Sequence, residues 1–108
     1  MNWYAIRTTP HKEFKAYEYN LKALGVESCL PTYKTRVMGP NGGCYKVLPL
    51  IRSFLFFRQP KIDFSLLNLN PYTKSVLRTN GKIAEIPDKE IQAMKDHIEN
   101  RHFQEDYD

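Results

Sequence analysis

The chain has 108 residues, 42% of them hydrophobic and 13% aromatic, and it carries a formal net charge of +4. This composition predicts one domain with a modest core and excludes a disordered chain, and no apolar run is long enough to cross a bilayer. The first residues lack the basic start and apolar segment of a signal peptide, so we expect a cytoplasmic protein without membrane contacts. Cys29 and Cys44 lack metal-binding spacing, and in a reducing compartment we expect free thiols.

The charges are distributed unevenly along the chain. Residues 1–82 carry 13 Lys and Arg against 4 Asp and Glu, a balance of +9, whereas residues 83–108 carry 3 against 8, a balance of −5. A basic body indicates a polyanionic partner such as nucleic acid. The acidic end indicates a helix with a solvated tail.

The first two predicted elements are a strand and a helix. Residues 2–8 have the β-branched and aromatic content of a strand. Thr9 is a suitable N-cap, Pro10 suits the first helical position, and Gly25 suits the left-handed residue that ends a helix. Between them, apolar side chains recur at helical spacing and predict one apolar stripe: Phe14, Tyr17, Leu21 and Leu24.

A long hairpin is predicted next. Residues 26–37 form a second strand, in which Pro31 favours an edge position or a bend. Residues 38–44 are a turn cluster rich in Gly, Pro and Asn, and a third strand ends in residues 53–58.

Both faces of the third strand are apolar over residues 49–58. Because side chains alternate in a strand, one face takes Ile51, Ser53, Leu55 and Phe57, and the other takes Leu50, Arg52, Phe54 and Phe56. Two interpretations follow. Either helices of this chain cover both faces, or the second face is exposed and receives a partner.

The remaining elements complete a mixed fold. Residues 63–69 form a short helix or turn with Asp63 as N-cap, residues 74–79 form a fourth strand, and Asn80 with Gly81 turns the chain toward residues 82–86. A last helix begins near Asp88, with helical spacing at Ile91, Met94 and Ile98, and residues 102–108 are expected to fray.

The element order is β-α-β-β-α-β-α. It predicts an α+β fold, in which helices flank a four-stranded, mostly antiparallel sheet, and residues 1–108 show no internal boundary.

Residues typical of catalysis or metal binding do not cluster. His11, His97 and His102 lack ligand spacing, and the glycines at 42–43 precede a strand rather than a helix. We therefore expect no metal, no cofactor and no enzymatic activity, and interpret the chain as a binding protein.

The first predicted helix has a second pattern opposite its apolar stripe. At about 100° per residue, basic and aromatic side chains share one face, with His11 beside them: Lys12, Lys15, Tyr19 and Lys22. Such a row could follow DNA phosphates, or it could be an ordinary solvated lysine face.

Three landmarks resemble a known family. They are Trp3-Tyr4 at the start, the proline and aromatic strand at 49–57, and Ile-Pro-Asp-Lys-Glu-Ile at 86–91. Together they resemble the N-terminal (NGN) domain of NusG-like transcription elongation factors, closest to the specialised RfaH and UpxY paralogues. The resemblance spans the whole chain, with two departures. The family's Phe-Pro-Gly-Tyr is replaced at 51–54, and no sequence for a KOW domain follows Asp108.

The resemblance implies a monomeric factor that suppresses pausing or termination, expected here at capsular polysaccharide operons. Its hydrophobic depression would bind the clamp helices of the largest subunit of RNA polymerase, and its first helix would face non-template or upstream DNA. The matching polymerase-binding positions are Trp3, Tyr4, Ile51, Phe54 and Phe56.

An alternative of another class remains open. A four-stranded sheet with exposed aromatic side chains could bind single-stranded RNA in the manner of an RRM, with bases stacked on Phe54 and Phe56. The glycine- and aromatic-containing RNP1 string of that class is absent.

Overall fold

The computed structural model describes residues 2–40 and 42–105. In chain order, the elements are β1 (Tyr4–Thr8), α1 (Glu13–Lys22), β2 (Glu27–Cys29), β3 (Thr32–Gly39), β4 (Gly42–Pro49), β5 (Phe54–Arg58), α2 (Phe64–Leu67), β6 (Thr73–Val76), β7 (Arg78–Thr79), β8 (Lys82–Ile83) and α3 (Asp88–Glu105). The predicted α+β class is confirmed. Within the described residues, no helix has the length and apolarity to span a membrane.

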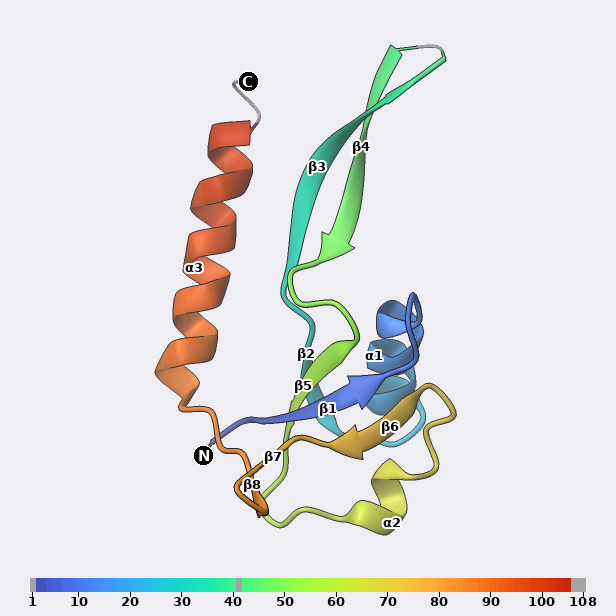
Figure 1. Ribbon diagram of the computed structural model, residues 1–108, viewed down its shortest axis with the longest axis vertical. Coiled ribbons are helices and arrows are strands. Elements are labelled where there is room, and N and C mark those ends of the chain that lie inside the picture. The colour runs from blue at the N-terminus through green and yellow to red at the C-terminus, as the bar shows by residue number, and fades with distance from the viewer. Residues whose placement is uncertain (1, 41, 106–108) are drawn as a thin grey trace.

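The main sheet has four strands in the order β2-β5-β1-β6, and every neighbouring pair is antiparallel. The first strand of the chain therefore lies inside the sheet, between β5 and β6 (Figure 1). The register places Ile6 opposite Leu55 and Cys29 opposite Phe56. This arrangement confirms the predicted four-stranded antiparallel sheet.

The predicted long hairpin is divided into two parts. The expected second strand breaks into β2 and β3 around Pro31, and the expected third strand breaks into β4 and β5 at residues 50–53. Pro31 has no N–H for a ladder, although its carbonyl accepts from Leu50 N at 2.8 Å. Ser53 turns the chain with a φ of 63°. As a result, β3 and β4 form a separate two-stranded ribbon that rises away from the sheet (Figure 1).

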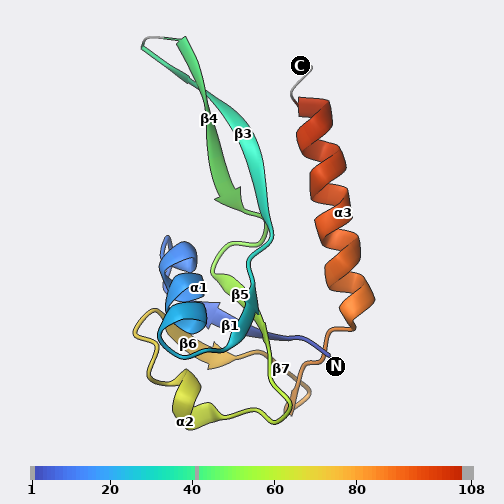
Figure 2. The same ribbon diagram turned by 180° about the vertical axis from the view of Figure 1, so that it is seen from behind.

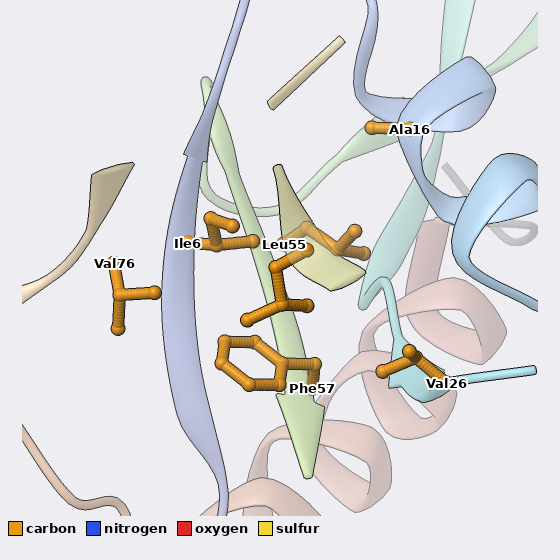
Figure 3. Packing of buried hydrophobic residues seen from close by; sticks show 7 residues of the cluster. Ile6, Ala16, Val26, Leu55, Phe57 and Val76 are labelled. Carbon is orange, nitrogen blue, oxygen red and sulfur yellow. The ribbon is translucent and has the colours of Figure 1, made fainter. Parts of the chain in front are cut away.

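The main core lies between the sheet and α1. Its buried side chains come from β1, β5, β6, α1, α2 and the segment before β2: Ile6, Ala16, Val26, Leu55, Phe57, Leu67 and Val76. Figure 3 shows Ile6, Leu55 and Phe57 side by side, below the helix that carries Ala16.

The predicted start and inner face of the first helix were partly wrong. The N-cap is Lys12 rather than Thr9, and Pro10 lies in a turn before the helix. Phe14 and Leu21 of the predicted stripe are exposed, whereas Tyr17 and Leu24 pack against the core. The buried side chains of α1 are instead Glu13, Ala16 and Asn20.

Hydrogen bonds explain why polar residues of α1 are buried. The carboxylate of Glu13 accepts from Ser53 N at 2.9 Å. Asn70 Nδ2 donates to the carbonyl of Ala16 at 3.0 Å and to Asn20 Oδ1 at 2.9 Å. Buried polar groups with such partners avoid most of the cost of desolvation, so they can replace apolar residues on an inner face.

Locally encoded turns and caps agree with the predictions. Asp63 accepts from Leu66 N at 3.0 Å as the N-cap of α2. Gly25, Asn80 and Gly81 all have a positive φ, as a helix end and a tight hairpin turn require.

The last helix begins at Asp88, as predicted, and runs beside β3 (Figures 1 and 2). Ile91 is buried and Met94 is half-buried, whereas the side chain of Ile98 lies outside the described residues. The helix extends to Glu105, and residues 106–108 lie outside the described part. The fraying expected at residues 102–108 stays a prediction.

Candidate functional site

The sheet has a second apolar face, which we call the α3 face because the start of α3 packs on it. Its buried side chains are Trp3, Ala5, Cys29, Phe56 and Ile91. Around them pack the half-buried side chains of Phe54, Leu77, Ile86 and Met94. The predicted alternation along residues 54–57 is confirmed, since Leu55 and Phe57 belong to the main core on the opposite face.

Trp3 joins the start of the chain to the start of α3. Its side chain is 3% exposed, and its backbone exchanges two hydrogen bonds of 2.8 Å with Ile86. The indole Nε1 donates to Asp88 Oδ1 at 2.8 Å, and the guanidinium of Arg58 lies 4.5 Å from the ring centroid. The indole is thus buried with its one donor satisfied and a cation against its ring.

Arg58 links two carboxylates at this edge of the sheet. Its Nε and Nη2 donate to Glu27 at 2.7 Å each, and its Nη1 donates to Asp88 at 3.2 Å. Hydrogen bonds from Arg58 hold the pKa of Glu27 below its ordinary value. The Trp3 hydrogen bond and, after it, the charge of Arg58 lower the pKa of Asp88. Nearby, burial raises the pKa of the Cys29 thiol.

The structure brings together three of the five predicted polymerase-binding side chains. Trp3, Phe54 and Phe56 share the α3 face. Tyr4 lies on the opposite face, with its ring centroid 5.6 Å from that of Phe57. Ile51 precedes β5, in the turn at 50–53, and is 40% exposed.

The expected exposure of Phe54 together with Phe56 is wrong. Phe56 is only 5% exposed, because Trp3 and the first turns of α3 cover it. The same burial removes the stacking platform that the RNA-binding alternative requires, since a base cannot stack on a covered ring.

One end of the α3 face remains uncovered. α3 starts beside the N-terminal end of β1 and runs away from the other end of that strand (Figure 1). There, exposed Arg7 is the cross-strand partner of half-buried Phe54. Sequence reasoning missed Arg7, although its alternation with Ala5 along β1 was the available signal.

The predicted basic row of α1 borders a shallow cavity of about 380 Å³. Lys15, Tyr19 and Lys22 line it, together with Tyr72 from the loop before β6. The rings of Tyr19 and Tyr72 meet edge to face, with centroids 6.4 Å apart, and Lys15 Nζ lies 6.0 Å from the Tyr72 centroid. Tyr72 was missed because no sequence spacing relates it to α1.

Other members of the row are placed differently. Lys22 Nζ contacts Glu18 Oε1 at 2.7 Å, and this hydrogen bond raises the pKa of Lys22 and lowers that of Glu18. Lys12 is half-buried at the N-cap, and His11 lines a different cavity.

Among the described residues, no group of His, Cys, Asp and Glu side chains is arranged to hold a metal ion. The two thiols are free, as expected, with Cys29 buried and Cys44 exposed.

Comparison with known proteins identifies the family. The search of curated proteins found no match. The family model described as "NusG: Transcription termination factor nusG" matches residues 1–95, which is most of the chain. The α+β fold with its four-stranded antiparallel sheet agrees with that family's N-terminal domain. Such domains belong to transcription elongation and termination factors rather than to enzymes. The chain belongs to the NusG family.

Proposed function

We propose that this chain binds the clamp helices of the largest subunit of RNA polymerase through the uncovered end of the α3 face. NusG-family factors generally bind RNA polymerase, and membership rests on the match over residues 1–95. The observation that carries the proposal is that Ile51 is 40% exposed in the turn at 50–53, which leads directly into half-buried Phe54 at the start of β5. Trp3 and Phe56 lie beneath and support the site rather than contacting the partner. Tyr4, on the other face, supports it only through the core.

The basic face of α1 is proposed to meet non-template or upstream DNA. Lys12, Lys15, Tyr19 and Lys22 are the proposed contacts, with His11 at the edge of this face. A protein that contacts the clamp and the DNA at the same time binds the closed state of the clamp more tightly than the open state, and so favours the closed state. A clamp held closed in this way should shorten pauses and reduce termination.

The assignment to a subgroup within the NusG family rests on the three sequence landmarks at residues 3–4, 49–57 and 86–91. We place the chain with the specialised RfaH and UpxY paralogues, acting as a monomer in the cytoplasm on capsular polysaccharide operons. Residues 1–108 are proposed to form one NGN-type domain that suffices for binding polymerase.

The test compares two exposed apolar side chains. Ile51→Ser should weaken binding to isolated clamp helices by about tenfold, as loss of an interface anchor typically does. Leu69→Ser is the matched control, because Leu69 is 61% exposed and lies outside the α3 face. Calorimetric titration gives the affinities, and single-round transcription gives the pause lifetimes. Equal affinity of Ile51→Ser and the unsubstituted chain would disprove the proposed site.

A further inference from the structure

A second concave site includes the turn at 50–53, and we call it the β4–α1 cavity. It has a volume of about 740 Å³ and is lined by the turn before α1, the start of α1 and the end of β4. Figures 1 and 2 both place the turn before α1 beside the end of β4. Its size lies in the range of ligand sites, and the predicted polymerase and DNA contacts account for only one of its lining residues, His11.

The walls of the cavity are held in an unusual backbone conformation. His11 and Ser53 both line it and both have a left-handed φ, of 64° and 63°. Non-glycine residues adopt this conformation at a cost, and they cluster at functional sites. Ser53 is fixed from both sides: its N–H donates to Glu13 at 2.9 Å, and its carbonyl accepts from Thr8 N at 2.9 Å. These hydrogen bonds hold the Ser53 wall of the cavity in place.

Apolar side chains form much of its surface. Phe14 and Val47 line the cavity and are 45% and 50% exposed, while Leu48 and Pro49 are half-buried. Exposed apolar side chains around a concave site favour a ligand with an apolar group.

The charges of the cavity are predominantly positive. Lys46 and Arg52 line it, and neither has an ion pair within residues 2–40 and 42–105. The one carboxylate, that of Glu13, is 5% exposed and already accepts from Ser53 N. A ligand that carries negative charge therefore complements the rim.

We propose that the β4–α1 cavity binds an acidic peptide segment of a partner protein, with one large apolar side chain inserted between Phe14 and Val47 and carboxylates at Lys46 and Arg52. The aliphatic and proline walls favour a peptide over nucleic acid, because a base would need a stacking platform and Phe14 is the only ring among the lining residues other than His11. This site shares the turn at 50–53 with the proposed polymerase contact, but Ile51 does not line it.

The experiment uses the full chain labelled with ¹⁵N and a short synthetic peptide with a central Phe flanked by Glu and Asp. Titration should shift the amide signals of residues 13–14, 46–48 and 52–53. Lys46→Glu/Arg52→Glu should weaken binding by about tenfold. Lys61→Glu/Lys82→Glu is the matched control with the same change in net charge at exposed lysines elsewhere, and it should bind like the unsubstituted chain.

Two further titrations measure separately how much the apolar wall and the charges of the peptide contribute to binding. Val47→Ser should weaken binding several-fold without loss of fold, because Val47 is half-exposed. A peptide with Gln and Asn in place of Glu and Asp should bind more weakly than the acidic peptide. Absence of shifts with the acidic peptide, or equal losses in both charge-reversal pairs, would overturn the proposal. Stronger shifts of the same amides by a single-stranded oligonucleotide would overturn it in favour of nucleic acid.

Discussion

Trp3 and Asp88 show how one residue pair can connect two distant parts of a chain. The indole N–H donates to the carboxylate at 2.8 Å, and Arg58 contacts both partners. A carboxylate that accepts a hydrogen bond and lies near a cation is stabilised in its ionised form. The pKa of Asp88 is accordingly below its ordinary value. The ionised form of Asp88 therefore stabilises the folded chain.

The pH dependence of stability follows from this shift. A carboxyl group with a depressed pKa in the folded state contributes stability above its unfolded pKa, near 3.8, and loses it as the pH falls through the folded value. In Asp88→Asn, we expect a lower free energy of unfolding at neutral pH and a shallower loss of stability below about pH 4. Urea unfolding across this pH range measures both quantities. The control is Asp96→Asn, an exposed carboxylate on the same helix. Parallel pH profiles for Asp88→Asn and the unsubstituted chain would contradict the prediction.

Single residues also show what sequence reasoning could and could not predict. The Asp63 cap and the Asn80-Gly81 turn were predictable because their partners lie within a few positions. The burial of Glu13 and Asn70 was not, since their partners, Ser53 and Asn20, lie far away in sequence. Helical periodicity treats a polar residue such as Glu13 as solvent-facing, and no local pattern marks the loop residue Asn70 as buried.

Within residues 2–40 and 42–105, the β3–β4 ribbon has no strand partner in the main sheet. Its two strands pair with each other, from Thr32 opposite Pro49 to Gly39 opposite Gly42, and residues 42–47 are exposed. The break at Pro31 was predictable, but the break at 50–53 was not, because no glycine or proline follows Leu50 before Phe54. Alternation assumes a regular strand through Ile51, whereas the structure places this residue in the turn at 50–53.

Shortening the ribbon should therefore leave the rest of the fold intact. Deleting two cross-strand pairs, Arg36 with Tyr45 and Val37 with Cys44, keeps the alternation and the turn at 39–42. We expect the melting temperature to change by no more than about 4 °C, since the removed Arg36, Cys44 and Tyr45 are exposed. Thermal unfolding followed by circular dichroism measures it. A loss of cooperative unfolding would mean that the ribbon is needed for the fold.

At the scale of the whole molecule, the two sheet faces differ in their coverage. α1 and α2 contribute to the core on one face, whereas α3 covers only part of the other. Residues 49–58 are therefore neither covered on both faces nor open along one whole face. Phe56 is covered by this chain, and Ile51 is exposed. Sequence alternation predicted which residues share a face, but not how far a helix extends over it.

The basic face of α1 leads to a graded prediction for DNA. Lys15→Glu should weaken binding to a transcription-bubble scaffold more than Lys22→Glu, because Lys22 is already paired with Glu18 at 2.7 Å. The losses should shrink as salt rises, since phosphate contacts act through counterion release. Fluorescence anisotropy at several salt concentrations measures them. Binding to isolated clamp helices should stay unchanged, and equal effects of the two substitutions would refute the ranking.

The central place of β1 has a consequence for how the protein is made. Among the described elements β1 comes first in the chain, yet both of its neighbours in the sheet come later, and Ile86 and Ile91, which pack with Trp3, come later still. During synthesis, β1 therefore lacks its first partner until β5 at residues 54–58 has emerged, and Trp3 stays uncovered until residues 86–91 follow. Sheets with such distant pairings fold slowly, because a long loop must close before any contact stabilises it. The nascent chain thus exposes its apolar first strand until these later segments emerge, which makes it a candidate for chaperone binding.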